Sequence, residues 1–313
     1  MFDRFVGIDW SGAKGPRQRG IQMSLARPGR AVPERVMPPD GRAWGRDAVY
    51  DWLLQAAAPA PVARLADHPV DQSTELASGG ALLVGIDFAF AHPFMDEGTY
   101  YPGLAGAPDH PAALWQMVDR VCADDPHLYG GAVFADEVLG DYYLSPRRHD
   151  APLYRSRRRL TEQAARASGR APSPTFKAIG ADNVATGSMA GMRLIHALKQ
   201  ALGDRLAVWP FDPVIPPRPP SLVLVEIFPS WYFHAVGMNP AKNAAAAGDF
   251  MSAALSAWES VGVGPDYAPR GPDADEADAM VAAAALRQIA GRKNGWQAPP
   301  EAAYEGWIFG VPA

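Results

Sequence analysis

Cysteine is almost absent from this chain, which has Cys122 alone among 313 residues. One cysteine can form neither an intramolecular disulfide nor a cysteine-built zinc site, so we expect a reducing, cytoplasmic location. Long apolar runs are missing too. None approaches the roughly 18 residues that span a bilayer, which excludes an integral membrane protein. The first four residues do not form a basic segment leading into an apolar one, so we expect no secretory signal.

Positive charge is also scarce. The chain has 29 Lys and Arg against 34 Asp and Glu, which gives a net charge of -5 and a pI near 5.8. This balance disfavours a protein that coats nucleic acid through charge alone, although a local basic patch can still bind phosphate. Hydrophobic residues make up 48 %, which predicts a sizeable core. The 31 Pro and 30 Gly predict long irregular connections.

Short apolar runs predict strands, and apolar residues at helical spacing predict helices between them. The expected strands cover residues 5–10, 21–26, 31–37, 81–87 and 221–228. The expected helices cover residues 43–57, 110–123, 188–202, 243–261 and 273–291, with a loop at 58–80. Three antiparallel strands followed by parallel additions predict an α/β fold of the ribonuclease H-like kind, a mixed sheet flanked by helices. We expect a single domain over residues 1–313, with a long helical and irregular insertion at about 92–205.

Acidic residues end three of the predicted strands. Asp9 ends the run VGID, Asp87 ends a second VGID, and Glu226 follows the apolar run VLV. Asp275 and Asp278 are three residues apart, which puts both carboxylates on one face of a helix. If these strands are neighbours in one sheet, their ends bring the five acids together.

Clustered carboxylates repel one another and are costly to bury unless a cation neutralises them. Carboxylate oxygens suit Mg²⁺ or Mn²⁺, and a pair of such ions can cleave a phosphodiester bond. The pattern therefore predicts a metal-dependent nuclease, a hydrolase with Asp9, Asp87 and Asp278 as catalytic acids. Each acid also has an ordinary alternative: Asp9 suits an Asx-turn, and Asp275 suits a helix N-terminus.

Six segments, taken in order, resemble the blocks of the DUF429 family, a set of proteins of uncharacterised function. They are GIDWSGAK at 7–14, GID at 85–87, VWPFD at 208–212, EIFP at 226–229, DEADA at 275–279 and EGWIFG at 305–310. The resemblance covers nearly the whole chain and implies a ribonuclease H-like nuclease. Its predicted metal-binding acids fall on Asp9, Asp87 and Asp278, joined by Asp275 and Glu226. The insertion at 92–205 departs from a minimal fold of this kind.

Basic residues with a candidate substrate role lie in two places. Lys14 follows the Gly-rich turn after Asp9 and is expected to contact a phosphate. The second place is an arginine cluster interleaved with tyrosines, which suits phosphate contact and base stacking. It contains Arg147, Arg148, Arg155, Arg157, Arg158 and Arg159. Two interpretations remain open for this cluster: contact with nucleic acid as a partner, or salt bridges to the protein's own acids.

Two other functions stay open at this point. The first is a non-catalytic binding module that keeps the same fold. The second is an actin-like nucleotide-binding phosphotransferase, but that class needs a duplicated domain and only one set of strands is visible. The turn after Asp9 does not complete a P-loop, because Ala13 separates Gly12 from Lys14 and no Ser or Thr follows the lysine.

Overall fold

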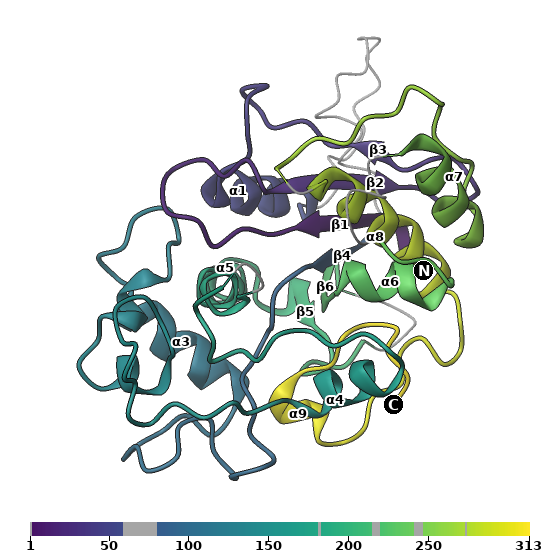
Figure 1. Cartoon of the computed structure of the whole chain (residues 1–313). Helices are drawn as coiled ribbons and strands as arrows, with labels where there is room; N and C mark the ends of the chain where they lie inside the picture. Colours follow the sequence, from purple (N-terminus) through teal and green to yellow (C-terminus); the bar gives the residue numbers. More distant parts are fainter. Residues whose placement is uncertain (1, 59–79, 181–182, 215–219, 241–246, 273) are drawn as a thin grey trace.

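The computed structural model of the chain describes residues 2–58, 80–180, 183–214, 220–240, 247–272 and 274–313 (Figure 1). Within these residues one sheet of six strands runs through the centre, in the order β3-β2-β1-β4-β6-β5. The strands are β1 (Phe2–Asp9), β2 (Gln22–Ala26), β3 (Glu34–Arg35), β4 (Ala81–Ile86), β5 (Leu206–Val208) and β6 (Leu222–Glu226). The α/β class and the mixed sheet are thus as expected.

The sheet has an antiparallel half and a parallel half. β1, β2 and β3 pair antiparallel as consecutive strands. β4 then pairs parallel to β1, and β6 and β5 continue the parallel half. Because the central strands β1, β4 and β6 run in the same direction, their carboxyl ends lie at one edge of the sheet. That edge carries Asp9, Asp87 and Glu226.

Helices pack on both faces of the sheet, and all of them lie after β3 in the sequence. They are α1 (Arg46–Ala56), α3 (Pro111–Val121), α4 (Leu160–Ala167), α5 (Ala185–Leu202), α6 (Pro229–Ala235), α7 (Gly248–Ala257), α8 (Asp275–Ile289) and α9 (Ala302–Glu305). Short 3-10 turns at Gly131–Phe134, Leu139–Tyr142 and Gly203–Arg205 complete the regular structure. None of the helices in the described residues is both long and apolar enough to cross a membrane.

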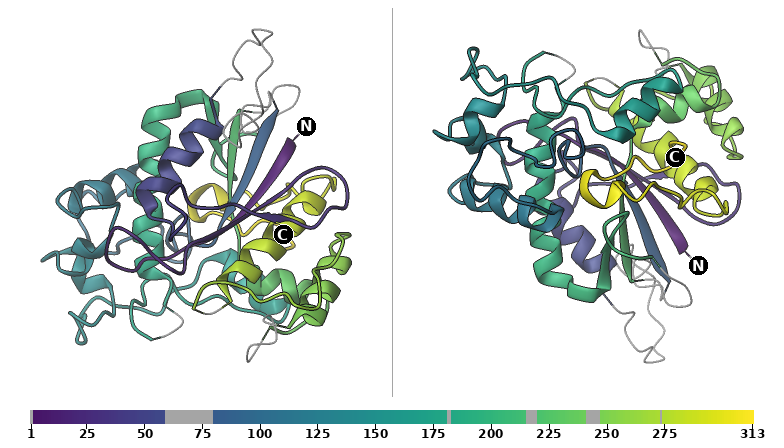
Figure 2. Two further views of the ribbon diagram at one scale, coloured as in Figure 1. Left: turned by 90° about the horizontal axis from the view of Figure 1, so that it is seen from above. Right: turned by 90° about the horizontal axis from the view of Figure 1, so that it is seen from below.

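Two apolar layers cover the two faces, because successive side chains of a strand point to opposite sides. Val6 and Ile8 belong to the layer that contains α1, α3 and α5. Phe5 and Leu83 belong to the layer that contains α6, α7 and α8. The views along the sheet show α1 and α5 on one side and α8 on the other (Figure 2). The strands are therefore buried on both faces, as their continuous apolar character predicts.

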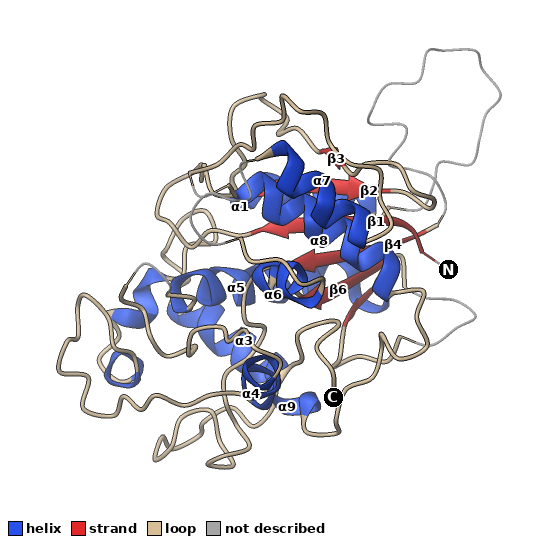
Figure 3. Ribbon diagram, turned by 45° about the vertical axis from the view of Figure 1, so that its right-hand side comes forward, coloured by secondary structure: helices blue, strands red, loops and turns tan. Residues whose placement is uncertain are grey.

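Helix α8 lies directly on β1 and β2 (Figure 3). This close approach depends on Gly7, where an added Cβ would come within 2.3 Å of the Ala279 carbonyl oxygen and 2.8 Å of the Ala282 Cβ. All alanines of the helix are buried, and Ala279, Ala282 and Ala283 lie next to Gly7. Small residues on both partners bring the first turn of α8, with its acids, next to the end of β1.

The helices and strands expected from the sequence differ from the observed ones mainly in the second half of the chain. The sequence pattern did not predict β5, which has three residues and follows the 3-10 turn at 203–205. It also did not predict α4, α6 or α9, which are too short to show a helical period. The segment between β4 and β5 holds α3, α4 and α5 joined by irregular chain, and α3 and α5 match the helices expected at 110–123 and 188–202. Most of the loop expected at 58–80 lies outside the described residues.

Candidate functional site

Asp9 and Asp87 lie side by side because their strands are parallel neighbours. Ile8 of β1 and Ile86 of β4 are register partners, and each acid follows its isoleucine. The Asp87 backbone N–H donates to the Ile8 carbonyl at 3.0 Å, so the pairing continues past the end of β4. Asp9 is 9 % exposed, and Asp87 is half-buried. Two carboxylates from separate parts of the sequence are thereby placed at one point of the sheet edge.

The first turn of α8 adds two more carboxyl groups. Asp275 is 8 % exposed, and its side chain is hydrogen-bonded to that of Asp9. Gly271, with a φ of +97°, lies against Asp275, and a Cβ there would come within 2.3 Å of Oδ2. Asp278, half-buried, lies close enough to Asp9 and Asp87 to act on both electrostatically. The structure thus brings together four of the five predicted acids.

The electrostatics of this cluster favour protonation. The pKa of Asp9 is raised well above its ordinary value, first by burial and then by the negative charges of Asp278, Asp87 and Asp275. The pKa of Asp87 is raised as well, by burial and then by Asp278 and Glu226. These carboxyl groups cannot all ionise at neutral pH at little cost unless a positive charge compensates them.

The donor set of the cluster suits a hard cation, because all its side-chain ligands are carboxylate oxygens. However, no three His, Cys, Asp or Glu side chains within the described ranges are grouped as a ready metal-ion site. The chemistry of these residues therefore fits Mg²⁺ or Mn²⁺, while their arrangement requires further oxygen ligands. Mg²⁺ sites commonly take such ligands from water and substrate phosphates.

Glu226, the fifth predicted acid, is held by an arginine. The Arg159 guanidinium donates to both of its carboxylate oxygens, at 2.7 and 2.5 Å, and the Phe90 backbone N–H donates to Oε2 at 3.0 Å. Glu226 is 2 % exposed. Its charge is already compensated inside the protein, and its contact with Phe90 fixes the segment that follows Asp87. Ser188 of α5 fixes the same segment by accepting from the Ala89 N–H at 3.1 Å.

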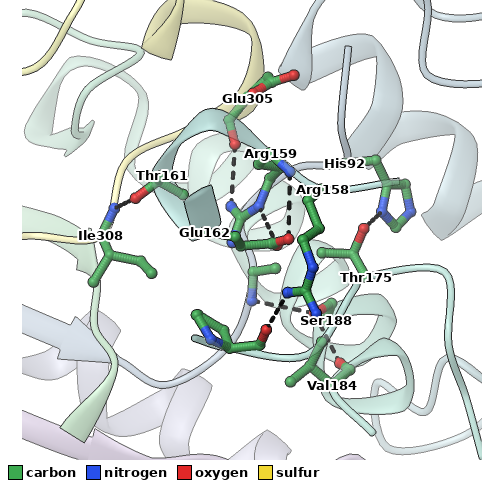
Figure 4. Close-up of polar contacts among 12 residues, drawn as sticks. His92, Arg158, Arg159, Thr161, Glu162, Thr175, Val184, Ser188, Glu305 and Ile308 are labelled. Carbon is green, nitrogen blue, oxygen red and sulfur yellow. Dashed lines mark hydrogen bonds and ion pairs between the residues drawn. The ribbon is translucent and has the colours of Figure 1, made fainter. Parts of the chain in front are cut away.

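Two arginines of the cluster, Arg158 and Arg159, donate to groups of the protein itself (Figure 4). Arg159 also donates to Glu162 at 2.9 Å and to the Glu305 carbonyl at 3.1 Å. Arg157 is 6 % exposed and donates to both carboxylate oxygens of Asp96. Internal pairing, one of the two open interpretations, thus describes Arg157 and Arg159.

The other two arginines with a predicted substrate role also have internal partners, although they are less buried. Arg158 donates to the Pro172 carbonyl at 2.6 Å. Arg155 is exposed and pairs with Glu97 at 2.7 Å. The cluster therefore connects segments of the chain to one another, and none of its four candidate substrate contacts lies beside Asp9.

The turn after Asp9 is fixed by a buried arginine from α1. Arg46, fully buried, donates from Nη1 to the Ser11 and Ala13 carbonyls, both at 2.9 Å. Gly12 presses against the backbone of Thr186 and Gly187, where a Cβ would come within 2.3 Å of the Thr186 carbonyl carbon. Lys14 extends from this turn as an exposed side chain. The predicted phosphate contact is thus a flexible side chain on a rigid turn.

A cleft of about 760 Å³, here called the Asp9 cleft, is lined by this turn and by three of the acids. Its lining includes Asp9, Asp87 and Asp275 together with three exposed cations, Lys14, Arg17 and Arg19. Tyr129 and Asn183 line it as well. Carboxylates and cations in one cleft can hold a metal-bound phosphate, because the acids bind the metal and the cations face the phosphate oxygens.

Several residues that build the site carry no signal in the local sequence. Arg46, Ser188 and Glu305 each act on backbone groups far away in the chain. The Glu305 carboxylate, for example, accepts from the N–H groups of Phe94, Met95 and Leu160 at 2.6–2.7 Å. A pattern of neighbouring residues cannot reveal such partners.

Comparisons of the chain with protein-family models, with curated proteins and with solved structures give no match. The resemblance to the DUF429 blocks therefore stays a prediction from the sequence. A proposal of function for this chain therefore rests on the geometry of the site.

Proposed function

We propose that the chain is a ribonuclease H-like, divalent-metal-dependent nuclease that hydrolyses phosphodiester bonds. One observation carries the proposal: Asp9, Asp87 and Asp278 come from β1, the end of β4 and α8, and act on one another in a single cluster. The strand order β3-β2-β1-β4-β6-β5, with an antiparallel and a parallel half, supports the fold assignment.

In this proposal Asp9, Asp87, Asp278 and Asp275 hold Mg²⁺ or Mn²⁺, and water and the substrate phosphate complete the coordination. The bound metal would lower the pKa of a water molecule and polarise the phosphate. Lys14 would contact a phosphate oxygen from the rigid turn. Glu226 would act indirectly, because Arg159 already neutralises it and its bond to Phe90 holds the segment after Asp87.

A non-catalytic nucleic-acid-binding module is the second candidate. The observation that favours it is that no three potential ligand side chains in the described ranges are already grouped around one point. Under this alternative the carboxyl groups of Asp9 and Asp275 share a proton, and the hydrogen bond between them is structural. Metal-independent binding of nucleic acid without cleavage would distinguish this module from a nuclease.

Mn²⁺ titration by calorimetry, paired with a cleavage assay, tests the proposal on wild type and Asp9→Asn. We expect saturable Mn²⁺ binding and cleavage by wild type, and loss of both in the variant. The variant should still fold, because an amide replaces a carboxyl that is repelled by its neighbours. Asp204→Asn, at an exposed position in the 3-10 turn after α5, is the matched control. Cleavage by Asp9→Asn at the wild-type rate would refute the assignment.

A further inference from the structure

Asp87 forms part of the wall of two cavities. One is the Asp9 cleft. The other, about 420 Å³, is here called the Arg170 pocket, and its lining includes Arg159, Arg170, Ser173, Phe228 and Ser230. Val184 borders both cavities as well. The two cavities therefore adjoin at Asp87 and Val184.

The two cavities differ in charge and in the groups they offer. The described lining of the Asp9 cleft includes three exposed cations, Lys14, Arg17 and Arg19, of which Arg17 is paired with Asp40 at the surface. Exposed cations of this kind can contact phosphate oxygens. The Arg170 pocket has two arginines against three acids, and Arg159 is fully engaged with Glu162 and Glu226. The pocket therefore has no excess positive charge for a second phosphate.

The Arg170 pocket instead offers flat and polar surfaces. The Arg170 Nε donates to the Ser230 hydroxyl at 2.8 Å, which fixes the guanidinium plane. Phe228 is half-buried and adds an aromatic ring. Guanidinium and aromatic planes stack on nucleobases, and serine hydroxyls can bond to a base edge or a sugar. The volume lies within the range of pockets that take small molecules.

We propose that the chain binds single-stranded nucleic acid, with a phosphodiester in the Asp9 cleft and the base of the adjoining nucleotide in the Arg170 pocket. This inference rests on the proposed function, since it takes the Asp9 cleft as the place where the phosphate is held. A base can enter such a pocket only when it is unpaired, because the bases of a duplex are stacked inside the helix. The substrate class is therefore a single strand.

Ala171 offers a way to block the pocket without disturbing the core, because it is exposed and lines the pocket. We expect Ala171→Trp to weaken binding of fluorescein-labelled oligothymidylate and oligouridylate by about tenfold or more, the loss of one stacked base. Fluorescence anisotropy in Ca²⁺ measures this binding without turnover. Phe228→Leu, on another part of the wall, should weaken binding in the same direction. Ala123→Trp, exposed and just beyond α3, should leave affinity unchanged.

Two results would overturn the inference: unchanged affinity in Ala171→Trp with a native melting temperature, or equal affinity for a duplex of the same sequence. An oligonucleotide with abasic sites sharpens the test, since its affinity should not respond to Ala171→Trp. The binding assay needs no cleavage, so its outcome is separate from that of Asp9→Asn. If Asp9→Asn cleaves normally while Ala171→Trp loses affinity, the assignment of Asp9 as a metal-binding catalytic acid is wrong. The proposed position of the nucleic acid in the two cavities is then still supported.

Discussion

Arg159 holds both carboxylate oxygens of Glu226, and this pair lies fully inside the protein, one strand away from Asp87. The arginine directly precedes α4, and the glutamate ends β6. Through Phe90, which donates to the same carboxylate, the pair reaches the segment that follows Asp87. The ion pair between Arg159 and Glu226 thus helps to position Asp87, which lies beside Asp9.

Arg159→Ala should destabilise the protein strongly. The change leaves Glu226 buried without a counter-charge, and breaking a buried pair in this way typically costs about 3–5 kcal/mol. Glu162 loses its hydrogen bond from Arg159 as well. Urea unfolding of wild type and variant measures the difference in free energy of unfolding. Arg155→Ala is the control, since its ion pair with Glu97 is exposed and is expected to contribute less than about 1 kcal/mol. If Arg159→Ala lowers the free energy of unfolding by as little as Arg155→Ala does, Arg159 is not the counter-charge of a buried carboxylate.

Gly7→Ala should separate α8 from β1. The added methyl group would meet the Ala279 carbonyl oxygen at 2.3 Å, and a helix carbonyl cannot rotate away, so the whole helix must shift. We expect a loss of about 1–3 kcal/mol in unfolding free energy, as for other overpacked cores. Because the first turn of α8 carries Asp275 and Asp278, Mn²⁺ affinity in calorimetry should fall too.

Gly264→Ala is the matched control for Gly7→Ala. A Cβ at that position meets no atom within 4 Å, and its φ lies outside the left-handed range. Its stability and Mn²⁺ affinity should both equal those of wild type. If Gly7→Ala lowers stability but leaves Mn²⁺ affinity intact, then the position of α8 does not govern the proposed metal site.

The acids of the site could be predicted from the sequence because strand ends are local features. Asp9 and Asp87 each follow an apolar run, and two parallel neighbours bring such ends together whatever the loops between them do. Asp278 could be placed because it is three residues from Asp275, which puts both carboxylates on one face of a helix. Local pattern was sufficient for these positions.

The arginines could not be interpreted in the same way. A run of Arg looks alike in sequence whether it faces solvent or carboxylates, and the partner that distinguishes the two cases is distant. Glu226 lies 67 residues after Arg159, and Asp96 lies 61 residues before Arg157. The strand β5 could not be predicted for a different reason. Its three residues are too few to show a period, and it is a strand because it pairs with β6 in the sheet.

Stability should fall as pH rises through the acidic range. Burial raises the pKa of Glu162 from 4.5 to about 7, although Arg159 opposes the shift. Between those pH values the native carboxyl holds a proton that the unfolded chain has lost, so raising the pH favours unfolding, by roughly 3 kcal/mol at most for this group. The raised pKa values of Asp9 and Asp87 act in the same direction. Urea unfolding at several pH values between 4.5 and 8 measures the slope, and Glu162→Gln should flatten it. A free energy of unfolding that increases with pH over this window would show that these carboxyls are ionised in the native state.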